Sequence, residues 1–117
     1  MEPQLRAGEL YKYQEMMESE KVKYISFYEF KPEDLDKVIL LFQKMQELRA
    51  KGDVNYPKAI TPTYGYQGEP SGFALFEVDN PQQINNHYIH YHPLVKYKWV
   101  PITEAADFIV TYLKAKK

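Results

Sequence analysis

Three histidines are the residues of this sequence best suited to metal binding or proton transfer, and all of them fall between residues 71 and 102. His87 and His90 are one helical turn apart, so a helix would place both rings on one face, and imidazole is a common ligand of transition metals. His92, however, stands beside Pro93, where a helix must end, and no acidic residue accompanies the histidines in the helix. Because two imidazoles do not complete a metal site, we expect ordinary helix-face or pocket histidines, with no metal and no cofactor.

Glu77 is the acidic residue best placed for catalysis, because it lies near the end of an apolar strand and ten positions before His87. A carboxyl group buried in a cavity has a raised pKa and acts as a general base or a hydrogen-bond acceptor. A helix that follows a strand returns across its sheet, which would bring His87 back towards Glu77. We predict that these two side chains border one cavity as catalytic residues. The alternative is an acid at a strand end that faces water or a lysine.

Aromatic residues are unusually frequent, with 11 tyrosines, 6 phenylalanines and one tryptophan among 117 residues. Tyrosine combines a large apolar ring with one hydroxyl group, which suits pocket walls and subunit interfaces. Four aromatic residues on the predicted central strands are candidates for ligand binding: Tyr24, Tyr28, Tyr97 and Trp99. Burial in a subunit interface is the alternative for the same side chains.

The segment around the histidines predicts a strand, a helix and a second strand in close succession. Residues 73–78 form a short apolar run, and the Asp-Asn-Pro sequence at 79–81 supplies a capping oxygen and a proline for a first helical turn. Pro93 prevents the helix from continuing far beyond Tyr91. Residues 95–100 alternate apolar and charged side chains, which is typical of a half-buried strand.

The preceding half of the chain begins with a predicted strand at 24–30 that is apolar on both faces. A sheet covered by helices on one side only should carry a polar row on the other side, so the second face of this sheet needs a cover. A helix should follow from Pro32 to Gly52, with Arg49 and Lys51 as cations suited to its C-terminal end.

Residues 58–66 look extended, but Pro57 and Pro62 cannot donate hydrogen bonds to a sheet, so we expect an edge strand or an irregular one. Residues 1–22 have an apolar spacing that predicts a helical arm, and Thr103 begins a last helix with an apolar stripe and a basic end. The order of elements is that of a split βαβ unit, which predicts an α+β, ferredoxin-like βαββαβ antiparallel sheet in residues 23–117. The expected core residues are Ile25, Phe27, Leu35, Val38, Phe42, Phe76, Ile84 and Ile109.

This order of elements resembles that of the dimeric α/β-barrel superfamily, which includes antibiotic-biosynthesis-type monooxygenases and many small uncharacterised domains. The likeness covers residues 23–102 and rests on the segment 72–102, on Lys31-Pro32-Glu33 at the start of the first helix, and on Val100-Pro101 at the end of the last strand. The resemblance implies a homodimer in which open sheet faces press together. It also implies pocket roles for an acid ending the third strand and a histidine on the second helix, which match Glu77 and His87.

A second resemblance leads to a different class of function. Residues 71–78 are similar to the RNP1 octamer of RNA-recognition domains, which share the βαββαβ order. Ser71 stands where the octamer has a base, and Leu75 stands where it has a second stacking aromatic ring. With 15 basic and 16 acidic side chains, the formal charge is −1, so no overall field attracts a polyanion and nucleic-acid binding is not expected.

The remaining composition excludes cysteine chemistry and gives an expectation for where the protein is located. The absence of cysteine excludes disulfides, thiolate metal sites and cysteine nucleophiles. No apolar run approaches the ~20 residues of a membrane span, and no signal-peptide stretch opens the sequence, so we expect a cytoplasmic protein with no membrane partner. We predict a homodimer that binds a small, mostly apolar molecule, with cofactor-independent oxygenation or isomerisation as the implied reactions. The alternative is an RNA- or protein-binding module that uses the aromatic sheet face.

Overall fold

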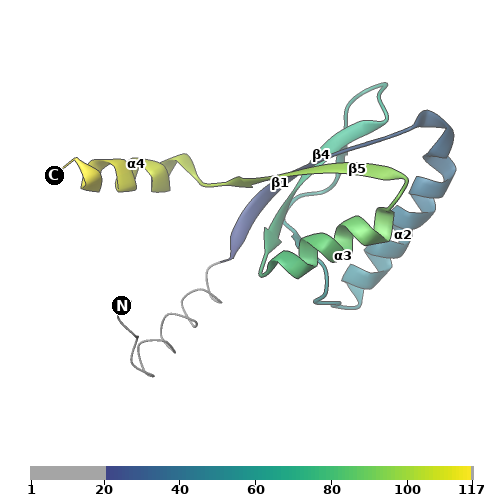
Figure 1. Ribbon diagram of the computed structural model, residues 1–117, viewed down its shortest axis with the longest axis horizontal. Helices are drawn as coiled ribbons and strands as arrows, with labels where there is room; N and C mark the ends of the chain where they lie inside the picture. The colour runs from purple at the N-terminus through teal and green to yellow at the C-terminus, as the bar shows by residue number, and fades with distance from the viewer. Residues whose placement is uncertain (1–20, 117) are drawn as a thin grey trace, which may run out of the picture.

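The structure is a computed structural model that describes residues 21–116. Its elements are β1 (Val22–Phe30), a 3-10 turn η1 (Pro32–Asp34), α2 (Leu35–Ala50), β2 (Lys58–Ala59), β3 (Tyr64–Gly65), β4 (Ser71–Val78), α3 (Pro81–Tyr91), β5 (Val95–Ile102) and α4 (Ala105–Ala115). Together they form an α+β domain with a five-stranded antiparallel sheet. Helices α2 and α3 lie on one side of the sheet, and α4 extends away from it (Figure 1). The helical arm predicted for residues 1–22 falls almost entirely outside the described residues.

The strands run in the order β2-β4-β1-β5, and β3 also pairs with β4. The two short strands on this edge confirm the irregular edge segment that the prolines predict. In the register, Ser26 of β1 lies between Ala74 of β4 and Trp99 of β5, so these three side chains share one face. We call this the helix face; it carries Tyr24, Ser26, Tyr28, Phe30, Gly72, Ala74, Phe76, Val78, Val95, Tyr97 and Trp99.

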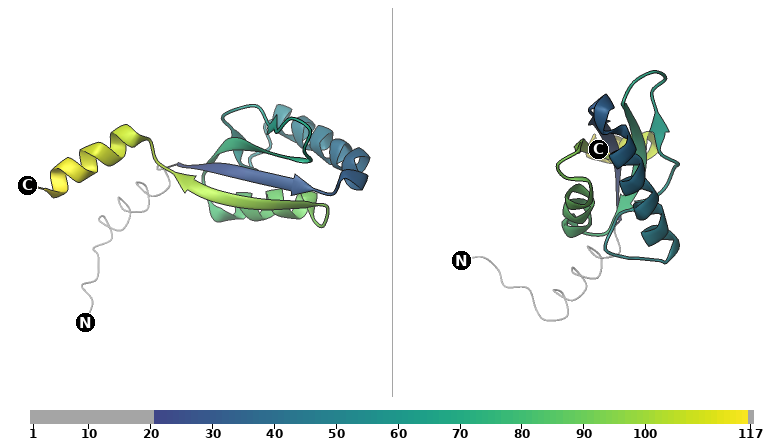
Figure 2. Two further views of the ribbon diagram at one scale, coloured as in Figure 1. Left: turned by 90° about the horizontal axis from the view of Figure 1, so that it is seen from above. Right: turned by 90° about the vertical axis from the view of Figure 1, so that its right-hand side faces the viewer.

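The opposite face, which we call the open face, has an apolar centre and charged margins. Its central side chains are Ile25, Phe27, Phe73, Leu75, Val100 and Ile102, and its charged side chains are Lys23, Glu29, Glu77, Lys96 and Lys98. Two edge tyrosines contact one end of this centre, since the rings of Tyr64 and Tyr66 lie 5.3 and 6.1 Å from that of Phe73. None of the described helices covers the rest (Figures 1 and 2).

Helix α3 begins as the Asp-Asn-Pro sequence predicts. The Asn80 side chain accepts a hydrogen bond from the Gln83 amide at 3.2 Å, and Pro81 occupies the first turn. The Gln83 side chain accepts from the Asp79 amide at 2.7 Å and donates to the Val54 carbonyl at 3.0 Å. These bonds fix α3 to the strand before it and to the loop after α2, and so set the position of His87.

The core is smaller than the sequence suggests. Phe76 is buried as predicted, together with Met45, Tyr91 and Val95. Of the other predicted core residues, five are half-buried: Ile25, Phe27, Val38, Phe42 and Ile84. Leu35 and Ile109 are wrong as core predictions, because 47% and 53% of their surfaces are exposed.

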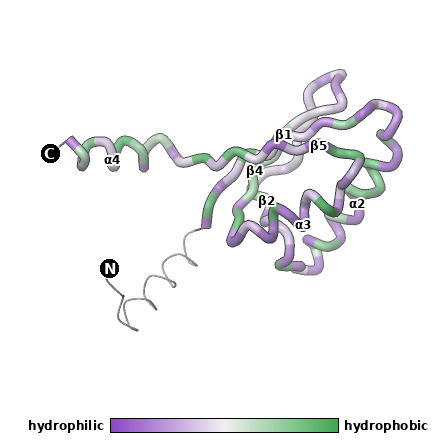
Figure 3. Tube along the Cα trace, viewed as in Figure 1, coloured by the Kyte–Doolittle hydropathy of each residue, from purple (hydrophilic) through white to green (hydrophobic). Residues whose placement is uncertain are grey.

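Helix α4 explains the error at Ile109. It leaves the end of β5 and does not return to the domain (Figure 2). Its large apolar side chains are about half exposed or more: Phe108, Ile109, Val110, Tyr112 and Leu113. Figure 3 shows the alternation of apolar and polar residues along this free helix. The radius of gyration, 18.2 Å, accordingly exceeds the ~13 Å of a compact chain of this size.

Among residues 21–116, no helix is both long and apolar enough to cross a membrane.

Candidate functional site

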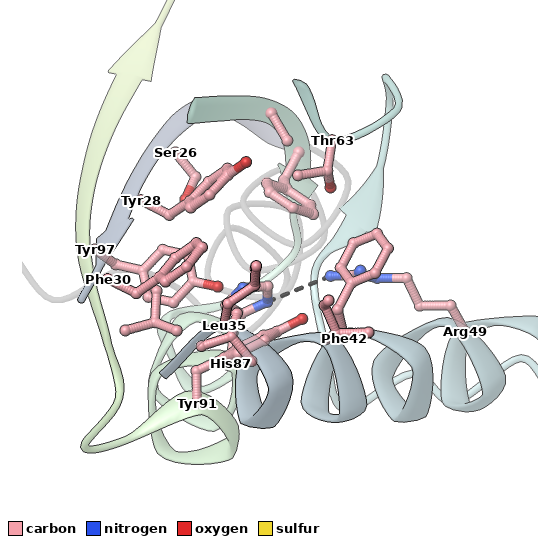
Figure 4. A pocket seen from close by; sticks show the side chains of 15 residues that line it. Ser26, Tyr28, Phe30, Leu35, Phe42, Arg49, Thr63, His87, Tyr91 and Tyr97 are labelled. Atoms are coloured by element: carbon pink, nitrogen blue, oxygen red, sulfur yellow. Dashed lines mark hydrogen bonds between the residues drawn. The ribbon is translucent and has the colours of Figure 1, made fainter. Parts of the chain in front are cut away.

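A cavity of about 260 Å³ lies between α2 and the helix face of the sheet. We call it the α2–sheet cavity. Apolar groups make up most of its wall, and it is lined by Ser26, Tyr28, Phe30, Leu35, Val38, Ile39, Phe42, Arg49, Thr63, Ala74, Phe76, His87, Tyr91, Val95 and Tyr97 (Figure 4). Part of the apolar stripe of α2 therefore borders a space, whereas Met45 of the same helix is fully buried in the core. This arrangement accounts for the exposure of Leu35, which the periodicity assigned to the core.

Arg49, in the last turn of α2, carries the only cationic group among the described residues of the wall. Its Nε donates to the Pro57 carbonyl at 3.2 Å, and its guanidinium carbon lies 4.9 Å from the centre of the Phe76 ring. Burial lowers the pKa of Arg49, although a guanidinium keeps its proton in proteins. A permanent positive charge therefore stands in a mostly apolar cavity.

His87 projects from α3 and is 2% exposed. Its Nδ1 lies 3.3 Å from Nη2 of Arg49, and since a guanidinium only donates, Nδ1 accepts and the ring proton belongs on Nε2. Burial, followed by the positive charge of Arg49 and by His90, lowers the pKa of His87 to about 3. The imidazole is therefore neutral at physiological pH, which suits an acceptor that orients Arg49.

Aromatic rings enclose His87 on several sides. The ring centres of Tyr97, Tyr91 and Trp99 lie 4.9, 5.1 and 5.1 Å from that of His87, and Phe76 lies at 5.4 Å. Burial raises the pKa of Tyr91 to about 12, and burial with the neighbouring Tyr91 raises the pKa of Tyr97. Both hydroxyl groups therefore remain protonated at physiological pH.

Ser26 is a further polar group in the wall. It is 1% exposed, and its Oγ has no hydrogen-bond partner among the described residues. Buried hydroxyl groups normally find a partner, because an unsatisfied one costs ~1–3 kcal/mol. The Ser26 hydroxyl is thus an unsatisfied polar group of the wall, and its Oγ is closed to solvent.

A family model matches residues 22–116, and its description is a domain of unknown function, DUF3303. The chain belongs to this family. The comparisons with curated proteins and with solved structures returned no match.

In this DUF3303 domain, three of the residues predicted from the sequence line the α2–sheet cavity: Tyr28, Tyr97 and His87. Trp99 stands behind them, packed against His87, and Tyr24 packs edge-on against Trp99 with 6.3 Å between the ring centres. Trp99 Nε1 is buried without a hydrogen-bond partner among the described residues. Tyr24 and Trp99 therefore support the wall rather than form it.

Glu77 does not meet His87 in the DUF3303 domain, so the prediction that they share a cavity is wrong. Phe76 contacts His87 from the helix face, and side chains alternate along β4, which places Glu77 on the open face. There its carboxylate pairs with Lys21 at 3.2 Å, and its side chain is 24% exposed. The alternative of an acid that faces a lysine describes this position.

The other two histidines have separate surroundings. His90 Nε2 lies 2.8 Å from the Leu41 carbonyl and ties α3 to α2, whereas His92 is exposed and packs against Tyr88. Within residues 21–116, no three metal-ligating side chains gather into a group that could hold an ion.

Several cavity residues were not selected from the sequence, among them the charged Arg49 and the polar Ser26. Arg49 stands seven positions after Phe42, on the same side of α2, and so continues the apolar stripe with a charge. Ser26 interrupts a row of aromatic residues on one face of β1. A charged or polar residue inside an apolar row is the signal that could have identified both.

Proposed function

We propose that this chain is a homodimeric protein of the dimeric α/β-barrel type and that it binds a small, mostly apolar molecule in the α2–sheet cavity. The strand order β2-β4-β1-β5 supports the ferredoxin-like part of this proposal. The observation that carries the ligand proposal is the cavity itself. Helices normally pack closely on a sheet, yet a pocket of about 260 Å³, partly open to solvent, separates α2 from the sheet.

The shape and chemistry of the wall support a ligand rather than a packing fault. Ligand pockets are mostly apolar, with a few polar groups that fix the orientation of the bound molecule. Here the apolar wall surrounds Ser26, Arg49 and the hydroxyl groups of Tyr91 and Tyr97. The volume lies near the ~300 Å³ lower end of such pockets, which favours a small molecule.

Catalysis in this cavity would involve groups other than the pair predicted from the sequence. No carboxylate from residues 21–116 lines the wall, so a base for proton abstraction would have to be the neutral imidazole of His87. A hydrogen bond from Arg49 to its Nδ1 leaves that imidazole a weak base. We therefore propose binding as the primary activity.

The homodimer proposal rests on two apolar surfaces that the described chain leaves uncovered. The apolar centre of the open face needs a cover, and α4 presents apolar side chains without reaching its own domain. A second copy of the chain would bring an open face and an α4 of its own, and so could cover both surfaces. An isologous contact uses the same surfaces on each partner. The mixed charges at the margins of the open face, such as Glu29 opposite Lys96, suit a self-complementary contact better than a polyanion.

The ligand proposal is tested by filling the cavity. Val38 lines it from α2, whereas Leu40 on the same helix is 66% exposed and does not line it. We expect native mass spectrometry of the purified wild-type protein and of Leu40→Trp to detect a retained small molecule, and Val38→Trp to have lost it. Equal retention by Val38→Trp and Leu40→Trp, or none by the wild type, would contradict the proposal.

A further inference from the structure

Arg49 is a partly buried cation without a described counterion. Among residues 21–116, the two ion pairs are Lys21–Glu77 and Lys23–Glu104, and both involve lysines remote from the cavity. Partial burial of a charge without an opposite charge beside it is unfavourable, and proteins often pair such a charge. The position of Arg49 in the wall therefore points to an anionic group that arrives with a ligand.

The protein contacts of Arg49 orient it without neutralising it. The Pro57 carbonyl, the neutral His87 ring and the face of the Phe76 ring are all uncharged groups. A guanidinium also has more N–H donors than these two hydrogen bonds use. The contacts hold the planar group in place, which is the preorganisation that two-point recognition of a carboxylate requires.

The cationic group stands at one end of the cavity. Figure 4 shows Arg49 reaching in from α2 at one end, and Tyr28, Phe30 and Tyr97 at the other. A molecule with an acidic group at one end and a flat apolar body at the other would match both ends.

We infer that the ligand is a small carboxylic acid with a flat, apolar body, and that Arg49 binds its carboxylate. This inference rests on the proposed function of the cavity and adds the class of ligand. A carboxylate fits better than a phosphate ester, because a phosphate carries more charge than Arg49 alone can balance and no lysine among residues 21–116 lines the wall. Ser26 and Thr63 add hydroxyl groups to the wall, but no described residue adds a second cation.

The test compares acids with neutral amides of the same shape. Titration calorimetry of the full chain with phenylacetate and phenylacetamide, and with indole-3-acetate and indole-3-acetamide, measures the preference without any substitution. Since a charge-assisted bidentate contact is roughly twice as strong as a neutral one, we expect at least one acid to bind about tenfold more tightly than its amide.

Variants on one helix then assign that preference to a residue. Arg49→Gln should abolish the difference between acid and amide while leaving the amide affinity within about twofold. Lys44→Gln removes an exposed cation from the same helix and should preserve the difference. If Arg49→Gln fails to fold, the wild-type comparison still decides the inference.

Two results would overturn the inference. If acid and amide bind equally to the wild-type protein, the ligand class is wrong while the binding function stands. If none of the acids binds, the inference is also wrong, and the retained-molecule experiment with Val38→Trp judges the proposed function separately.

Discussion

The two faces of the sheet carry comparable rows of large apolar side chains, but polar groups are distributed differently among them. On the helix face, polar groups lie within the apolar region. Ser26 and Tyr97 belong to the sheet itself, and His87 and Arg49 approach it from the helices. On the open face, charges stand at the margins and the centre is wholly apolar. A few polar groups within an enclosed apolar wall are typical of ligand sites, whereas an apolar centre with a polar rim is typical of protein interfaces.

This difference supports the proposal that each face has its own kind of partner. The helix face already has its helices, so only a small molecule can enter what remains between them and the sheet. The open face offers a broad surface that only another protein surface, or a helix such as α4, can cover. Substitutions on one face should therefore leave the function of the other face intact.

The largest expected effect concerns Gly72, where the helix face depends on close approach of backbones. A Cβ at this position would collide with the Tyr64 carbonyl and lie 2.6 Å from the Tyr28 hydroxyl, which itself donates to that carbonyl at 3.1 Å. We expect Gly72→Ala to lower the free energy of unfolding by about 3 kcal/mol or more, measured by urea denaturation. Gly65→Ala is the control, since its Cβ would make an ordinary 3.5 Å contact with the Tyr28 hydroxyl. Equal losses in the two variants would contradict this account of Gly72.

The next effect concerns the open face and α4. Ile109→Glu places a charge on the apolar part of α4, and burial of an unpaired carboxylate against a second copy should weaken the dimer by about 100-fold or more. Thr111→Glu is the matched control, because Thr111 lies on the same side of α4 as the charged Asp107. The Thr111 Oγ1 donates a hydrogen bond to the Asp107 carbonyl at 3.1 Å. Light scattering across a dilution series measures both.

Three outcomes would contradict the dimer as proposed. A wild-type protein that stays monomeric at micromolar concentration would contradict the homodimer. Equal weakening of the dimer by the two α4 variants would contradict a place for α4 in its interface. A monomer that binds single-stranded RNA through Phe27 and Phe73, which are neighbours on the open face, would assign that face to nucleic acid.

A pH-dependent effect on stability is expected from the titration of His87. Because its pKa falls from about 6.5 in the unfolded chain to about 3 in the folded one, the unfolded state binds the proton more readily between these values. The stability contributed by neutral His87 is complete above pH 6.5 and is lost as the pH falls, by up to about 1.4 kcal/mol per pH unit. The groups facing the ring are Arg49 from α2, His90 and Tyr91 from α3, and Tyr97 from β5.

The measurement is the free energy of unfolding between pH 7 and pH 4. His87→Asn keeps an acceptor for Arg49 but cannot titrate in this range, so we expect it to reduce the slope. His92→Asn, at an exposed position on the same segment, should leave the slope unchanged. A wild-type slope equal to that of His87→Asn would show that His87 takes up its proton readily in the folded protein.

The sequence predicted most of the fold because the local signals agree with the tertiary structure. The two prolines flanking β2 and β3, the Asn80 cap and the end of α3 before Pro93 depend on backbone chemistry that acts within a few residues. The cavity was not predictable in this way. The stripe of α2 that includes Leu35 and Phe42 has the same spacing whether it packs against a sheet or faces a space.

The site was predicted in part for a similar reason. The spacing of Glu77 and His87 along the chain is compatible with a shared cavity, but the face on which a strand residue lies depends on register, and a shift of one position reverses it. Phe76, not Glu77, is the β4 side chain that contacts His87. Arg49 was missed because a basic residue at the end of a helix has a sufficient local explanation in the helix dipole.

The smallest expected effect is at Glu77, and it separates the two faces most directly. Because its carboxylate pairs with Lys21 on the open face, Glu77→Gln should change the affinity of the α2–sheet cavity for any bound acid by less than about twofold. His87→Gln should weaken the same binding, since it alters the group that orients Arg49. Calorimetry with phenylacetate compares the two variants. A loss at Glu77→Gln as large as that at His87→Gln would mean that the two faces act on one ligand, and the division of the sheet into a ligand face and a partner face would be wrong.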